Sequence, residues 1–217
     1  ESVLQEIVDA AIAIAGADFG NLQLVEPGTG RLKLAAQRGF PAWWLEFWNG
    51  EASRGACHMA QQAAARIIVE DVETSAIFAR RPELAVQREA GVGAVVSTPA
   101  NSWSGTMVGM ISVHFKQPHR PDERALRLLD MLASRAADLV ERDRALATEH
   151  MLRARFEALD RLGSALSTRL ARGNDAVDMN ALLQDVVDQA RVACDAEYAA
   201  FGVGEDPERP FEYWAYG

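Results

Sequence analysis

The sequence predicts an α+β fold in which an antiparallel sheet is flanked by helices and followed by a long C-terminal helix. Three observations lead to this prediction. Along the first half of the chain, apolar residues switch between helical and strand spacing, with turn-rich segments between them. No proline occurs from Asp122 until Pro207, which favours one very long helix. A helix and hairpin pattern from the start of the chain also recurs near its end.

The first segment predicts a helix that is followed by two strands. Gly16 is a suitable end for the helix, and leucines alternate on both sides of the turn at residues 27–30. The apolar residues at helical spacing are Val3, Leu4, Ile7, Val8, Ala11, Ile12 and Ile14. The alternating strand residues are Leu22, Leu24, Leu32 and Leu34.

The middle of the first unit predicts short helices between further strands. Proline favours the first position of a helix, and glycine favours the position just after its end. The expected helices are residues 41–48, 56–65 and 82–90. The expected strands are residues 66–69, 94–99 and 107–115, the last two joined by a turn at 101–105. Strands joined by so short a turn pair in antiparallel fashion.

Residues 121–177 are expected to form a long connecting helix with the character of a coiled coil. Its apolar residues step by three and four positions in two stripes, with a change of register between Leu146 and Leu152. The stripes are Leu129, Leu132, Ala136 and Leu139, and then Leu152, Phe156, Leu159, Gly163, Leu166 and Leu170. A single solvated helix needs no such stripes, so we expect a parallel homodimer that pairs through residues 122–172. The alternative for the first stripe is packing against its own domain.

A partial internal repeat aligns residues 4–27 with residues 183–206. The identical pairs are Leu4/Leu183, Gln5/Gln184, Val8/Val187, Asp9/Asp188, Ala11/Ala190, Ala17/Ala196 and Glu26/Glu205. The second copy lacks a counterpart of residues 40–115, so we expect the chain to be part of a longer protein. The predicted units are a first domain at 1–120, the helix at 121–177 and a truncated second domain at 178–217.

The composition argues against several classes of protein. Asp and Glu total 31 against 22 Lys and Arg, and the net charge of -9 disfavours binding to nucleic acid or anionic lipid. No apolar run is long enough for a membrane span, and no secretory signal segment is recognised. We therefore expect a cytoplasmic protein without membrane insertion. Cys57 and Cys194 are isolated in the sequence, so neither a disulfide framework nor a zinc site is expected.

Five short stretches of the sequence resemble the GAF domain family. They are ADFG at 17–20, RIIVEDV at 66–72, AGVGAVVSTP at 90–99, GMISVHF at 109–115 and PHRP at 118–121. The resemblance covers residues 1–143 and is strongest to GAF domains of bacterial sensor kinases that also carry PAS modules. It implies a PAS-related antiparallel sheet with a ligand cavity on one face, and a relay through helices to an output domain. The partial repeat resembles the start of a second GAF domain.

The candidate ligand-binding residues lie on the aromatic segment 43–48, on the helix after it and on two strands. They are Trp43, Trp44, Phe47, Cys57, Thr98, Ser112 and His114. Met110, Ser112 and His114 share one face of their strand, because side chains alternate across a sheet. His114 is either a haem or metal ligand or a hydrogen-bonded strand residue, and the second is favoured because no second ligand accompanies it. The aromatic residues either wall a pocket or pack as ordinary core, and the cofactor is unknown.

No catalytic motif is recognised, whether a phosphoacceptor helix, a Walker sequence or a nucleophile elbow. Cys57 is the only thiol of the first unit, whereas GAF-type methionine sulfoxide reductases need several, so a structural role is favoured for it. The Asp-Ile-Pro segment of bilin-binding members and the Asn-Lys-Phe-Asp-Glu signature of cyclic-nucleotide-binding members are absent. We expect a non-enzymatic sensory module of a two-component system, with a histidine kinase as its parent. The alternative is a ligand-free structural dimerisation module.

Overall fold

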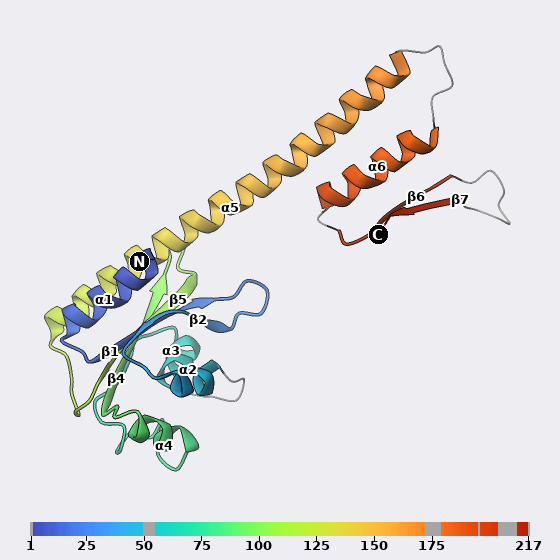
Figure 1. The fold of residues 1–217 in the computed structure, drawn as a ribbon. Coiled ribbons are helices and arrows are strands. Elements are labelled where there is room, and N and C mark those ends of the chain that lie inside the picture. Colours follow the sequence, from blue (N-terminus) through green and yellow to red (C-terminus); the bar gives the residue numbers. More distant parts are fainter. Residues whose placement is uncertain (1, 50–54, 172–178, 195, 204–211, 217) are drawn as a thin grey trace. The chain divides into compact units, whose positions relative to one another are not determined.

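The computed structural model describes all residues except 1, 50–54, 172–178, 195, 204–211 and 217. The chain divides into two compact units, residues 1–143 and residues 144–217, and each is described by itself. Figure 1 shows the elements of both units along the chain. Within the described residues, no helix is long and apolar enough to cross a membrane.

The first unit contains a five-stranded antiparallel sheet in the order β2-β1-β5-β4-β3. Its strands are β1 (Phe19–Val25), β2 (Leu32–Arg38), β3 (Ile67–Val69), β4 (Ala94–Asn101) and β5 (Met107–Phe115). β1 pairs Phe19 with His114 of β5, so the first hairpin joins the second one through the centre of the sheet. The antiparallel sheet predicted from the sequence is confirmed, and the strand 66–69 begins one residue later than predicted.

One face of the sheet is covered by α1 (Val3–Ala15) and by the first turns of α5 (Glu123–Ala171), as Figure 1 shows. Their shared core is made of the apolar residues that alternate toward this face. They include Val8 and Ala11 of α1, Leu22 of β1, Val96 of β4, Ile111 and Val113 of β5, and Leu126, Leu129 and Ala133 of α5. Leu129, Leu132 and Ala136 of the first apolar stripe therefore pack against their own unit, which was the alternative to pairing with a second copy, whereas Leu139 is 45% exposed.

The other face carries α2 (Ala42–Asn49), α3 (Ala56–Ala63) and α4 (Pro82–Glu89). A second core lies here, centred on the fully buried Phe78 and on Val72, Val95, Phe40 and Trp44. α4 starts with a proline, as its sequence predicted, and α3 ends at Ala64 in a left-handed conformation. The sheet therefore lies between two cores. One is formed with α1 and α5, and the other is rich in aromatic side chains.

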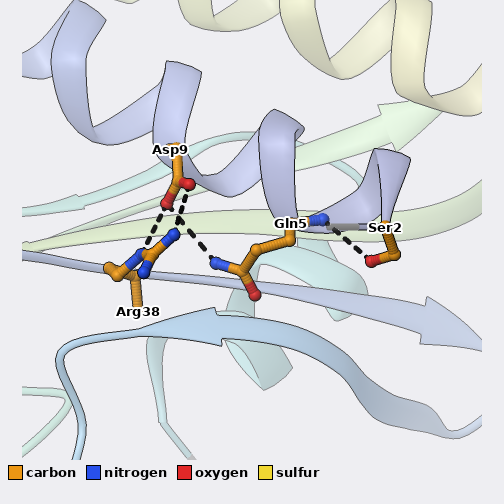
Figure 2. Close-up of polar contacts among 4 residues, drawn as sticks. All are labelled: Ser2, Gln5, Asp9 and Arg38. Carbon is orange, nitrogen blue, oxygen red and sulfur yellow. Dashed lines mark hydrogen bonds and ion pairs between the residues drawn. The ribbon is translucent and has the colours of Figure 1, made fainter.

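α1 is fixed at its first turns and along its length by polar contacts, which Figure 2 shows. The hydroxyl of Ser2 accepts a hydrogen bond from the Gln5 backbone N–H and caps the helix. Arg38 of β2 donates from Nε and Nη2 to the two carboxylate oxygens of Asp9, at 2.8 and 2.5 Å, and Gln5 donates to the same carboxylate. This fork-like pair ties the edge strand to the helix.

One glycine is required by a close backbone approach. A Cβ atom at Gly93 would lie 2.7 Å from the carbonyl oxygen of Lys116. The Gly93 N–H donates to the Phe115 carbonyl at 2.7 Å, and its own carbonyl accepts from the Val72 N–H. Gly93 therefore closes the start of β4 onto the end of β5.

The second unit contains the rest of α5, α6 (Met179–Cys194) and a hairpin of β6 (Ala199–Val203) and β7 (Glu212–Tyr216). The helix and two strands predicted for the repeat are thus present. Val187 of α6 is buried, like its counterpart Val8 in α1. Leu166 and Leu170 of the second predicted stripe lie outside the residues whose side chains the structure describes.

Candidate ligand-binding site

A cavity of about 700 Å³ lies on the aromatic face of the sheet in the first unit. Strands β1 and β5 contribute Asn21, Gln23 and His114, and β4 contributes Val95. The helices α2 and α3 supply Trp44, Trp48, Cys57, His58 and Gln61. A volume of this size is typical of small-molecule sites in proteins.

The floor of the cavity holds buried polar atoms for which no partner exists among the described residues. They are the side-chain oxygens of Asn21 and Gln23 and both ring nitrogens of His114. Asn21 is 3% exposed and His114 is 2% exposed. Buried polar groups of this kind usually have a hydrogen-bond partner, because leaving them without one costs roughly 1–3 kcal/mol each. Their gathering at one cavity therefore points to a ligand that completes them.

His114 is neutral at physiological pH. Burial lowers the pKa of its imidazole from 6.5 to about 3. The ring meets Phe40 and Trp44 edge-on, at centroid distances of 4.9 and 5.6 Å. A neutral imidazole offers one N–H donor and one lone-pair acceptor to whatever fills the cavity.

Aromatic rings wall the cavity on the side of α2. Trp44 stacks on Phe40 at 3.7 Å between ring centroids, and Phe40 stacks in turn on Phe19 of β1. Trp48 lies 5.7 Å from Trp44 and tilts toward it. The Trp44 indole N–H donates to Gln87 of α4, which fixes the ring. The wall therefore offers two apolar ring surfaces at an angle of 52° to each other, and each of them suits contact with a planar group.

A small hydroxyl and thiol network lies beside His114. The Cys57 sulfur is 3.1 Å from the Ser112 hydroxyl oxygen and 3.5 Å from that of Ser97, and the two hydroxyls are 2.8 Å apart. Burial raises the pKa of the Cys57 thiol. Because the thiolate is the reactive form, this cysteine is a poor nucleophile at neutral pH.

Charged residues form the rim of the cavity on the first hairpin. Lys33 pairs with Glu26 at 2.8 Å, and Arg31 lies beside them. Gln61 of α3 donates to the Gly30 carbonyl at 2.8 Å and so ties the hairpin turn to the helix across the rim. Charge therefore sits at the mouth of the cavity, and the floor is uncharged.

Only some of the seven residues predicted from the sequence to bind a ligand line the cavity. Trp44, Cys57 and His114 line the cavity, and Ser112 lies directly behind the Cys57 sulfur. Phe47 is half-buried against Trp48, and Trp43 is 37% exposed. Thr98 lies away from the cavity, because it faces α5 and accepts a hydrogen bond from Arg66.

Sequence reasoning missed the amides of Asn21 and Gln23 and the rim residues Gln61, Glu26 and Lys33. The signal for the two amides was their period of two in a strand that is otherwise apolar, which puts both on the face of Phe19. Side chains alternate between the two faces of a sheet along a strand, and Thr98 and Val95 are an odd number of positions apart. Thr98 therefore lies on the face opposite to that of Val95.

Within the described part of the chain, no group of three or more His, Cys, Asp or Glu side chains could hold a metal ion. His114 brings two buried ring nitrogens without a partner among the described residues to the cavity, and His58 of α3 also lines it. The sequence favoured a hydrogen-bonded strand residue for His114. In the structure both of its ring nitrogens are buried and have no hydrogen-bond partner among the described residues, so this hydrogen bond is not observed.

The sequence profile of the GAF domain family matches residues 1–141. No curated protein matches the chain significantly. The first unit is similar in fold to several solved structures. One is a domain assigned to a two-component sensor histidine kinase from Sinorhizobium meliloti, with a TM-score of 0.55 and 18% identity, covering 68% of this chain and 94% of that one.

Two further solved structures share the fold. The GAF domain of a phosphoenolpyruvate-protein phosphotransferase from Coxiella burnetii has a TM-score of 0.56 and 17% identity, covering 67% of this chain and 84% of that one. A free methionine-R-sulfoxide reductase from Thermoplasma acidophilum has a TM-score of 0.51 and 18% identity, covering 64% of this chain and 89% of that one. At such identities the similarity establishes the fold alone.

Proposed function

The chain belongs to the GAF domain family, and we propose that its first unit is a sensory input module in which a bound small molecule changes the packing of α5. One observation carries the proposal: a cavity of about 700 Å³ gathers the incompletely hydrogen-bonded side chains of Asn21, Gln23 and His114. A ligand that hydrogen-bonds to these groups gains more free energy than it would on a solvated surface.

Arg66 supplies a physical link between the cavity and the long helix. It follows α3, which lines the cavity, and directly precedes the edge strand β3, from which its side chain contacts α5 on the other face of the sheet. There it donates to the Leu126 carbonyl at 2.9 Å, to the Thr98 hydroxyl at 3.3 Å and to the Asp130 carboxylate. A movement of α3 upon ligand binding would therefore pull directly on the first turns of α5.

The relay needs two packings of α5 that differ little in free energy. A ligand shifts the balance only by the difference between its affinities for the two states. The first turns of α5 are capped by Asp122, whose carboxylate accepts from the Ala125 N–H at 2.7 Å, so the start of the helix is well defined. The change is then a shift of the whole helix against the sheet rather than melting of its first turn.

Exposed apolar side chains on α5 support pairing with a second copy. In the first unit Leu128 is 37% and Met131 is 65% exposed, and in the second unit Leu152, Phe156 and Leu159 are 57%, 72% and 56% exposed. Large apolar side chains that repeat on one helix face favour burial against another helix. We propose that this second helix belongs to another copy of the chain, so that the module acts as a homodimer.

The wider context is also a proposal. α6 and its hairpin repeat the order of α1, β1 and β2, which supports a second GAF domain that starts within residues 178–217. The similarity to a domain assigned to a sensor histidine kinase supports a kinase as the parent protein. The acidic composition and the regulatory family support a cytoplasmic, non-enzymatic module.

Cysteine crosslinking along α5 tests the relay in a background that carries Cys57→Ser and Cys194→Ser. We expect inter-chain disulfides with Leu152→Cys, and much weaker ones with Arg161→Cys, because nine helical positions at about 100° each put the two residues on opposite sides. Native mass spectrometry of protein purified from its own host is expected to show a bound small molecule. No inter-chain crosslink would contradict the dimer, and no bound mass would favour the ligand-free structural module.

Two arginine variants test the link. Arg66→Met is expected to leave the bound mass in place and to abolish the dependence of crosslinking on it, because the contacts to Leu126 and Asp130 are lost. Arg88→Met is the matched control, since Arg88 pairs with Glu73 away from α5. Equal responses in both variants would show that Arg66 is not the link.

A further inference from the structure

The polar atoms of the cavity floor form a coherent recognition pattern. Asn21 and Gln23 are next-but-one neighbours on β1, and β5 places Ser112 and Met110 opposite them and His114 opposite Phe19. The side-chain oxygens of both amides accept hydrogen bonds, and a neutral imidazole both donates and accepts. A ligand that satisfies this floor carries at least one N–H or O–H donor and one acceptor.

The charge of the floor limits the ligand further. Among the described residues that line the cavity, the Asp, Glu, Lys and Arg side chains are Glu26, Arg31 and Lys33, all on the first hairpin at the rim, and the histidines are His58 of α3 and His114 of β5. The His114 imidazole cannot provide a positive charge near neutral pH, because burial holds its pKa at about 3. An anionic group brought to the floor would lose its hydration without meeting an opposite charge, which is strongly unfavourable.

The aromatic wall limits the shape. Trp44 is stacked nearly parallel on Phe40, and the Trp48 ring, tilted by 52° to Trp44, extends the wall toward Gly55, where a Cβ atom would lie 2.7 Å from that ring. Flat rings gain contact area against such a wall at little cost in conformational entropy. The space between wall and floor therefore favours a planar group whose edge carries the donor and acceptor.

We propose, on the basis of the ligand-sensing function above, that the cavity takes an uncharged planar ligand with an N–H donor, either an aromatic amide or a nitrogen heterocycle, and discriminates against carboxylates. Asn21, Gln23 and His114 read the donor and acceptor edge, and Trp44 and Trp48 hold the ring. The charged rim takes no part in this discrimination.

Two pairs of probes of nearly equal shape test the inference. Nicotinamide is compared with nicotinate, and indole-3-acetamide with indole-3-acetate, by calorimetry and by amide chemical shifts of the isotope-labelled chain at pH 7. We expect each amide to bind at least about tenfold more tightly than its acid. Equal or tighter binding of the acids would overturn the inference, and so would failure of both amides to bind.

Two variants assign the preference to the floor. Asn21→Leu keeps the size of the side chain and removes its oxygen, and we expect it to reduce the amide preference at least about fivefold. Lys33→Ala changes the charge of the rim, and we expect the preference to persist in it. A preference that disappears in Lys33→Ala and persists in Asn21→Leu would place the discrimination at the rim and overturn the inference.

The inference and the proposed function fail in different ways. If native mass spectrometry of host-purified protein finds a bound carboxylate, phosphate or haem whose presence alters crosslinking along α5, the sensory function stands and the neutral-ligand inference falls. If it finds no bound mass and none of the four probes binds, both fall. A bound neutral heterocycle or amide supports both.

Discussion

Residues 3–38 and residues 179–216 each form a helix followed by an antiparallel hairpin, yet they differ in what is built on them. In the first region β5 pairs with β1, and α5 packs beside α1. In the second region β6 and β7 form a sheet of two strands within the described residues. Two strands are marginally stable by themselves, whereas five strands under two helices bury a full core. The same local pattern therefore gives the same elements without giving the same degree of stabilisation.

The repeat preserves the framework and not the chemistry of the cavity. Val8 and Val187 are both buried on their helices. In contrast, the positions of Asn21 and Gln23 are taken by Ala200 and Gly202 in the aligned second copy. The two amides of the polar floor thus have no equivalents at the aligned positions of the second copy.

The largest expected difference between the two regions is their response to acid. His114 lies on β5, and its pKa is lowered from 6.5 to about 3 by burial. Below pH 6.5 the imidazole of His114 becomes protonated in the unfolded chain and stays neutral in the folded chain. The free energy of unfolding therefore decreases as the pH falls from 6.5 toward 3. The slope approaches about 1.4 kcal/mol per pH unit below pH 6.5, and the loss between pH 6.5 and 4.5 is roughly 2 kcal/mol. Hydrogen exchange at the Val8 amide is expected to report this loss, and exchange at the Val187 amide is not.

Two variants check the assignment to His114. His114→Phe keeps the ring contacts with Phe40 and Trp44 and is expected to flatten the slope above pH 4.5. His119→Gln retains His114, so we expect this variant to show the same slope of stability against pH as the original chain. The carboxyls of Glu26 and Glu73 have lowered pKa values because of Lys33 and Arg88, so their contributions are lost at lower pH. An unchanged slope in His114→Phe would contradict the prediction.

A smaller difference is expected from the matched core positions of the two helices. Val8→Ala removes two methyl groups from a fully buried site and is expected to lower the free energy of unfolding of the first unit by about 2 kcal/mol. Val187→Ala removes the same groups from α6. We expect it to abolish the protection of the α6 amides from hydrogen exchange and to leave the free energy of unfolding of the first unit unchanged. Urea denaturation followed by amide exchange measures both. A fall in the stability of the first unit with Val187→Ala would show that the two regions unfold together.

The sequence predicted the elements well because local rules determine them. The proline at the start of α4 and Gly16 after α1 set their bounds within a residue or two of the prediction. The proline-free stretch after Asp122 gave α5. The domain bounds at 120 and 177 and the pairing of two copies stay predictions, since they depend on contacts that periodicity does not specify.

The candidate site was harder to predict because it is made by strand order. β1 lies next to β5 in the sheet although about 80 residues separate them in sequence, and this pairing, with Asn21 opposite Ser112 and Phe19 opposite His114, brings Asn21 and His114 to one cavity. Side-chain direction caused the other difference, since Thr98 points toward α5. Arg66 was recognised as part of a motif, but its reach to Leu126 depends on how tightly α5 packs on the sheet.

The smallest expected difference concerns the pair of acidic residues that the repeat preserves. Asp9 accepts from Arg38 and Gln5 (Figure 2), whereas one carboxylate oxygen of Asp188 is buried without a partner among the described residues. The register explains this, because Arg38 pairs with Gly20 and the aligned Ala199 pairs with Tyr216. Asp9→Leu is therefore expected to lower the midpoint of urea unfolding slightly, and less at about 500 mM than at about 20 mM salt. Asp188→Leu is expected to raise protection of α6, since it removes a buried oxygen that lacks a donor. Equal destabilisation of α1 and α6 by the two variants would show that the Asp188 carboxylate accepts a hydrogen bond as Asp9 does. The two hairpins would then differ in length and not in how they hold the acidic residue.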